Sequence, residues 1–174
     1  MPPDRSDAVV ASPLPEARPV RLIRLSRAAH PGRVRPTALA VLVAAAGLAG
    51  LARWLRPDPR GLGTHEQLGF RQCGFVFATG LPCPTCGMTT AFSHMAHGQP
   101  LAALEANPMG AMLAVGVYLA GAGALVSLVT GRAWTANWQR IGGMRLVIGG
   151  LGLLAASWGF KIAWGLAQGT LPIR

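Results

Sequence analysis

Three long apolar stretches without a charged residue constrain the fold of this 174-residue chain more than any other feature. One of them, residues 109–130, extends about 33 Å as a helix, enough to cross a hydrocarbon core of about 30 Å. Inside a bilayer every backbone polar group must be satisfied within the protein, which favours helices for segments of this kind. We therefore predict an all-α membrane protein with about three transmembrane helices in contact with the lipid bilayer. The predicted spans are 37–55, 108–130 and 146–167.

The charged residues support this interpretation and suggest an orientation. They make up only 13% of the chain, against about 25% in an average soluble domain. Ten of the 16 basic residues lie in 1–36 and 131–145, and six lie on the other side of the predicted membrane. The positive-inside rule then places the N-terminus in the cytoplasm and the loop 53–107 outside. Membrane orientation explains the net charge of +10, and because no nucleic-acid-binding motif accompanies it, we expect no nucleic-acid partner.

The N-terminal segment differs in composition from the rest of the chain. Residues 1–36 carry seven arginines and seven prolines, and that many prolines would interrupt any continuous helix. We predict a disordered basic tail over 1–36 and a helical membrane domain over 37–168.

The loop between the first two spans holds all three cysteines. Its centre reads Cys83-Pro84-Thr85-Cys86, and Pro84 is suited to the first position of a helix that has Cys83 as its N-cap. Gly98 and Pro100 are stop signals, so we predict an amphipathic interfacial half-helix within 80–98, from about Pro84 to His97. One face of this helix would carry Cys83, Cys86, Thr90, His94 and His97.

The CxxC pair suggests thiol–disulfide chemistry. A thiol at a helix start faces unpaired backbone N–H groups and the positive end of the helix dipole, which lower its pKa. In this interpretation Cys83 attacks, Cys86 resolves the mixed disulfide, and Cys73 is a third participant. No catalytic carboxylate pair, nucleophile elbow or phosphate-binding loop is present, so hydrolase or kinase chemistry is not expected.

Two other interpretations of the same residues remain open. Cys83, Cys86, His94 and His97 could bind zinc or another thiophilic metal, but Cys86 and His94 would lie about 12 Å apart on one straight helix. Such a site needs a bend in the chain or ligands from two chains. Otherwise no cofactor is expected, and the cysteines are small buried residues, or a static disulfide, in a turn shaped by prolines and Gly87.

Small residues line one face of each of the last two spans and would let another helix approach closely. The faces comprise Gly116, Ala120 and Ala124, and Gly149, Gly152, Ala156, Gly159, Ala163 and Ala167. They favour a homo-oligomer or a membrane-protein partner, so the leading hypothesis is an interaction or accessory protein. A thiol–disulfide protein is the first alternative and a metal-binding module the second. Lys161, close to the end of its span, is expected to extend its charge to the interface.

The motif also resembles a known family. Cys83-Pro84-Thr85-Cys86-Gly87-Met88-Thr89, followed by His97-Gly98 and then by Asn107-Pro108 at the start of a span, is similar to a CP-x-CG-x-T signature of small bacterial integral membrane proteins of unknown function. The resemblance covers about residues 64–130. It implies a bacterial membrane protein, which we expect in the inner membrane, and it marks a set of signature positions without implying an activity. The signature positions are Cys83, Pro84, Cys86, Gly87, Thr89, Asn107 and Pro108.

Overall fold

The computed structural model describes residues 23–27, 31–136 and 142–169. Three of its helices are long and apolar enough to cross a membrane. They are α1 (Pro31–Trp54), α5 (Pro108–Thr130) and α7 (Gly143–Ala167). The prediction of an all-α membrane protein with three candidate spans is confirmed.

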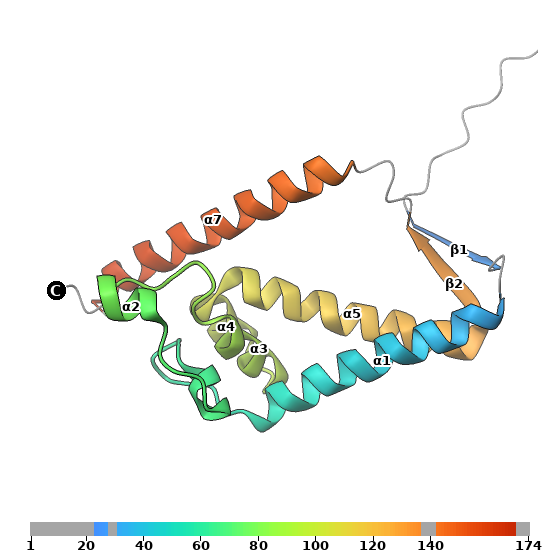
Figure 1. Ribbon diagram of the computed structural model, residues 1–174, viewed down its shortest axis with the longest axis horizontal. Helices are drawn as coiled ribbons and strands as arrows, with labels where there is room; N and C mark the ends of the chain where they lie inside the picture. Colours follow the sequence, from blue (N-terminus) through green and yellow to red (C-terminus); the bar gives the residue numbers. More distant parts are fainter. Residues whose placement is uncertain (1–22, 28–30, 137–141, 170–174) are drawn as a thin grey trace, which may run out of the picture.

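Helices α1 and α5 form the main packed pair, and small side chains bring them close together (Figure 1). On α1, Ala38, Ala45 and Ala52 recur every seven residues and are buried. A Cβ placed on Gly121 of α5 would lie 3.1 Å from the Ala45 Cβ, so the backbones approach closely at this point. Of the small residues that we predicted for an interface on α5, Ala124 is buried, whereas Gly116 and Ala120 are exposed.

A two-stranded antiparallel sheet closes the end of this pair that lies away from the cysteine loop (Figure 1). Strand β1 (Ile23–Arg27) precedes α1, and strand β2 (Arg132–Ala136) follows α5. The expected disordered tail therefore does not extend to residue 36, because residues 23–27 are a strand and α1 begins at Pro31. Pro36 lies inside α1 near its start, a position where a membrane helix tolerates proline. Residues 1–22, where the rest of the tail was expected, lie outside the described residues.

The loop between α1 and α5 folds into short helices at the other end of the pair (Figure 1). These are a 3₁₀ helix, Thr64–Leu68, and the α-helices α2 (Gly74–Thr79), α3 (Met88–Ala96) and α4 (Pro100–Ala106). A small alanine core, which includes Ala91 of α3 and Ala103 of α4, packs these two helices against α5. Buried hydrogen bonds reinforce the docking, since Ser93 Oγ donates to the Leu55 carbonyl at 2.7 Å. The loop is thus a folded cap on the bundle.

Helix α7 contacts the rest of the chain through its C-terminal half, and its N-terminal half diverges from α5 (Figure 1). Its buried residues, Ser157, Lys161 and Gly165, are four apart and share one face. This face lies on the cysteine loop, whereas the predicted small-residue face, which includes Gly152 and Gly159, is exposed. The tertiary contacts of α7 therefore involve a different face from the one that the sequence singled out.

Candidate functional site

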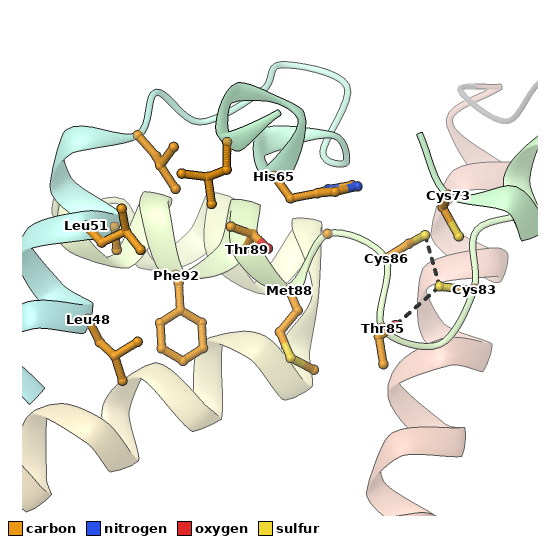
Figure 2. A pocket seen from close by; sticks show the side chains of 14 residues that line it. Leu48, Leu51, His65, Cys73, Cys83, Thr85, Cys86, Met88, Thr89 and Phe92 are labelled. Atoms are coloured by element: carbon orange, nitrogen blue, oxygen red, sulfur yellow. Dashed lines mark hydrogen bonds between the residues drawn. The ribbon is translucent and has the colours of Figure 1, made fainter. Parts of the chain in front are cut away.

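The three cysteines gather at the junction of α2, α3 and α7 (Figure 2). Cys83 Sγ lies 3.1 Å from Cys86 Sγ, and the Sγ atoms of Cys73, Cys83 and Cys86 all lie within 4.8 Å of one another. All three are free thiols, with Cys86 buried and the other two half-buried. Cys73 comes from the N-cap of α2, so a residue ten positions before the CxxC pair completes the cluster.

The CxxC segment is a turn that precedes the helix, not its first turn as we predicted. The Cys86 amide donates to the Cys83 carbonyl at 3.0 Å, and the Met88 amide donates to the Thr85 carbonyl at 3.2 Å. Gly87 then adopts a left-handed conformation with φ of 81° and is the N-cap of α3, which begins at Met88. The predicted helix start at Pro84 and N-cap at Cys83 are therefore wrong, because the left-handed residue interrupts the right-handed path.

The two thiols of the pair differ strongly in acidity. Burial opposes ionisation of Cys83, but hydrogen bonds from Thr85, Cys86 and Cys73 outweigh it and lower the pKa of Cys83 from 9.0 to about 7. Burial and the hydrogen bond to Cys83 raise the pKa of Cys86 to about 12. At neutral pH a large share of Cys83 is therefore thiolate, whereas Cys86 stays protonated. Neighbouring hydroxyl and thiol groups stabilise the Cys83 thiolate, in place of the helix N-terminus that we expected.

Lys161 of α7 binds the backbone beneath the cysteines. Its Nζ donates to the carbonyl oxygens of Ala106 at 2.6 Å, Cys86 at 2.9 Å and Gly61 at 3.3 Å. The expected snorkelling to the interface is therefore wrong, because three carbonyl groups inside the protein replace the water that the ammonium would otherwise seek.

Three more side chains tie the turn to α5 and α7. Buried Asn107 caps α5 by accepting from the Gly110 amide at 2.8 Å, and its amide group donates to the Cys86 carbonyl at 3.0 Å. Ser157 Oγ reaches the Asn107 amide oxygen at 3.3 Å. Trp158 Nε1 donates to the Pro82 carbonyl at 2.7 Å. Helix α5 begins at Pro108, where the predicted span begins, with Asn107 as its N-cap, and the same Asn107 contacts the cysteine turn.

Gly87 lies where a side chain has no room. A Cβ at this position would lie 2.5 Å from the Gly61 carbonyl oxygen and 2.7 Å from that of Ala106, and it would also meet Lys161 Nζ. These are two of the three carbonyls that accept from Lys161. The close approach of Lys161 to the cysteine turn therefore depends on glycine at position 87.

The two histidines of the predicted metal set lie apart from the sulfur cluster. His94 Nδ1 pairs with Gln99 Oε1 at 2.7 Å, and His97 Nδ1 pairs with the Ser93 carbonyl at 2.8 Å. Thr90, expected on the same face, is buried against Thr64, with the hydroxyl oxygens 2.8 Å apart. The structure thus brings together Cys83 and Cys86 of the predicted residues and adds Cys73 in place of the histidines.

A cavity of about 610 Å³ opens beside the cysteines (Figure 2). The C-terminal part of α1 and the first turns of α3 supply most of its apolar lining, and the thiols lie at one side. The lining residues are Leu48, Leu51, Ala52, Leu55, His65, Leu68, Cys73, Cys83, Thr85, Cys86, Gly87, Met88, Thr89 and Phe92. The cavity combines a mostly apolar surface with the thiol groups of Cys73, Cys83 and Cys86.

Sequence reasoning missed Lys161, Ser157 and Trp158 as parts of the site. For Lys161 the sequence did offer a signal, because a basic residue within a membrane helix usually pairs with a polar group of the protein. Nothing in the local sequence indicates that Trp158 contacts the turn 76 positions earlier, or that Ser157 contacts Asn107.

Comparison with known proteins agrees with the resemblance seen in the sequence. No curated protein and no solved structure matches the chain. One family model matches residues 73–121, a segment that begins at Cys73 and ends within α5. Residues 73–121, which hold the complete cysteine cluster, therefore match the family described as "Protein of unknown function (DUF2752)".

Proposed function

We propose that this protein catalyses thiol–disulfide exchange at a membrane surface, with Cys83 as the nucleophile and Cys86 as its partner. The observation that carries this proposal is the 3.1 Å approach of two thiols with opposite pKa shifts. A disulfide has an S–S bond of about 2.05 Å, so a movement of about 1 Å would join them. The stabilised Cys83 thiolate favours the reduced state, which makes the corresponding disulfide an oxidant.

The exposure of the two thiols sets the order of the steps, because Cys83 is half-buried and Cys86 is buried, so a substrate reaches Cys83 first. A substrate thiolate attacks Cys83 Sγ of the oxidised protein, the Cys83–Cys86 bond breaks, and Cys86 Sγ leaves and takes up a proton. The second thiolate of the substrate then attacks the substrate sulfur that is bonded to Cys83, and Cys83 leaves as a thiolate. Two electrons pass from the substrate dithiol to the protein pair. The pKa of about 7 makes Cys83 a good leaving group in the second step.

The test is trapping of the mixed disulfide with purified protein in detergent or nanodiscs. Incubation with glutathione disulfide should give a stable mixed disulfide on the Cys73→Ser/Cys86→Ser double variant, because Cys83 reacts and no other thiol of the cluster is left to resolve it. Cys83→Ser should form none at neutral pH. Cys73→Ser, the matched control within the cluster, should retain exchange. A Cys83→Ser protein that exchanges at the wild-type rate would contradict the proposal.

A soft metal ion is the second candidate, and the three sulfur atoms within 4.8 Å of one another favour it. Three thiolates suit zinc or copper(I), with Cys73 as the third protein ligand instead of a histidine. Titration with cadmium, followed by thiolate-to-metal charge-transfer absorption, tests this candidate. Cys73→Ser should weaken binding strongly, whereas the His94→Ala/His97→Ala double variant should not. Tight binding that survives Cys73→Ser would exclude the three-sulfur site.

We further propose that the protein resides in a bacterial inner membrane with its N-terminus in the cytoplasm and the cysteine cluster outside. The excess of basic residues in 1–36 and 131–145 supports this orientation, and persistent disulfides suit the outer compartment. Labelling of intact cells with a membrane-impermeant maleimide, before and after mild reduction, tests it at Cys83. Labelling that appears only after lysis would show the opposite orientation. Association with a second copy or with another membrane protein through the exposed small-residue face of α7 stays a prediction, and it is compatible with thiol–disulfide exchange.

A further inference from the structure

The cavity beside the thiol pair is bounded by a candidate membrane span as well as by the cysteines. Its α1 wall is formed by Leu48 and Leu51, which lie within a candidate span and are 48% and 42% exposed. Met88 and Phe92 of α3 form the facing wall (Figure 2). An apolar molecule dissolved in the bilayer can therefore reach the cavity without crossing water. A peptide would leave its backbone polar groups unsatisfied against these side chains.

Two polar side chains of the cavity lie toward the sulfur atoms. The ring of His65, from the 3₁₀ helix, points toward the cysteines, and Thr85 lies beside Cys83, whereas Thr89 of α3 lies farther from the sulfur atoms, near Leu51 (Figure 2). Hydroxyl and imidazole groups can donate hydrogen bonds to carbonyl oxygens. The cavity therefore suits a molecule with an apolar body and a few polar acceptor atoms at the end next to Cys83 and Cys86. The volume of about 610 Å³ fits a substituted ring and the first part of an alkyl tail.

We propose that this cavity binds a lipid-soluble quinone, which reoxidises the cysteine pair. The proposal rests on the proposed function, because exchange with a substrate dithiol leaves Cys83 and Cys86 reduced and therefore requires a two-electron acceptor. An S–S bond forms between the Cys83 thiolate and Cys86, which gives up its proton, and water supplies the second proton. Two electrons and two protons pass to the quinone, two O–H bonds form, and a quinol leaves. The quinone is the oxidant, and the dithiol is the reductant.

The experiment uses the full chain, reduced and then freed of reductant, in nanodiscs under argon. The probe is a fully substituted short-chain benzoquinone, whose ring has no position free for covalent addition of a thiol. We expect one quinol per protein, measured by the loss of quinone absorbance, together with the loss of two free thiols. Cys83→Ser and Cys86→Ser should each abolish the reaction. Quinone that stays unreduced by the wild-type protein would overturn the proposal.

A matched pair of variants on α1 tests the cavity itself. Leu51→Trp fills the cavity and should slow quinone reduction at least tenfold. Leu39→Trp makes the same change at a position that is 53% exposed and does not line the cavity, and it should leave the rate unchanged. Equal rates in the two variants would show that the quinone reacts elsewhere and would overturn the assignment.

Oxidation by glutathione disulfide separates this inference from the proposed function. This small soluble oxidant reacts at the half-buried Cys83 and should oxidise the wild type and Leu51→Trp at similar rates. If glutathione disulfide forms the Cys83–Cys86 disulfide and the quinone does not, the quinone site is wrong and the exchange function stands. If neither oxidant forms the disulfide, both proposals fail.

Discussion

The ammonium group of Lys161 donates a hydrogen bond of 2.9 Å to the carbonyl oxygen of Cys86, a residue 75 positions earlier in the chain. The same ammonium also binds the carbonyl groups of Gly61 and Ala106. One side chain of the third candidate span thus joins the cysteine turn, the segment after α1 and the end of α4. The conformation of the cysteine turn therefore depends on the packing of α7 against it.

Replacing Lys161 with methionine should destabilise this end of the molecule. The variant keeps a long side chain but removes a donor from the carbonyl groups of Gly61, Cys86 and Ala106, of which Cys86 keeps the Asn107 amide, and we expect this loss to cost about 2–3 kcal/mol. The measurement is the thermal unfolding midpoint in detergent. Arg145→Met is the control, because it removes a basic side chain from an exposed position of the same helix. A Lys161→Met protein as stable as the control would show that the three hydrogen bonds contribute little.

Gly87→Ala should destabilise the protein by more than about 2 kcal/mol. The residue has a φ of 81°, which is unfavourable for alanine, and the added Cβ would also lie 2.5 Å from the Gly61 carbonyl oxygen. Gly98→Ala separates these two effects, since Gly98 has a φ of 72° but a Cβ added there would meet nothing within 4 Å. We expect this control to lose only about 1 kcal/mol. Similar unfolding midpoints for the two variants would exclude a special packing role for Gly87.

The alkylation rate of Cys83 should rise with pH around a midpoint of about 7. Below this pH the thiol is protonated and unreactive, and above it the thiolate reacts, so the rate reaches a plateau on the alkaline side. Cys86, with a pKa raised to about 12, should stay unreactive through neutral pH. Iodoacetamide labelling followed by mass spectrometry gives both profiles.

Thr85→Val should shift the midpoint of the Cys83 profile to higher pH. The Thr85 hydroxyl lies 3.3 Å from Cys83 Sγ and stabilises the thiolate, and valine retains the shape without the hydroxyl. Thr130→Val is the control, because it makes the same change at the far end of α5. An unchanged midpoint in Thr85→Val would mean that other groups account for the acidity of Cys83.

Asn107→Ala should lose about 2–4 kcal/mol of stability. The substitution removes the N-cap of α5 and also the donor to the Cys86 carbonyl. Ser157→Ala, which removes one partner of the same network, should lose only about 1 kcal/mol. Chemical unfolding in mixed micelles compares the two variants. A larger loss for Ser157→Ala than for Asn107→Ala would place the centre of the network on α7.

The sequence predicts correctly those features that depend on interactions between residues close together in the chain. Asn107-Pro108 predicts the start of α5, because an N-cap side chain and a first-turn proline act within a few residues. Cys83-Pro84-Thr85-Cys86 predicts two neighbouring thiols for the same reason. The prediction for the start of α3 is wrong because the local sequence does not indicate that Gly87 is left-handed. Its conformation fits the close approach of Gly61 and Ala106, which lie far from it in the sequence.

The sequence by itself determined that this is a helical membrane protein with one cysteine-bearing loop, because long uncharged stretches have few stable alternatives in lipid. Only the tertiary structure decided which residues meet there. It brought Cys73 to the CxxC pair, turned His94 and His97 to other partners, and placed Lys161 beneath the turn. The physical reason is that buried carbonyl groups and a buried ammonium must form hydrogen bonds with each other, even between segments that are distant in the sequence. Hydrogen bonds of this kind leave no periodic pattern in the sequence.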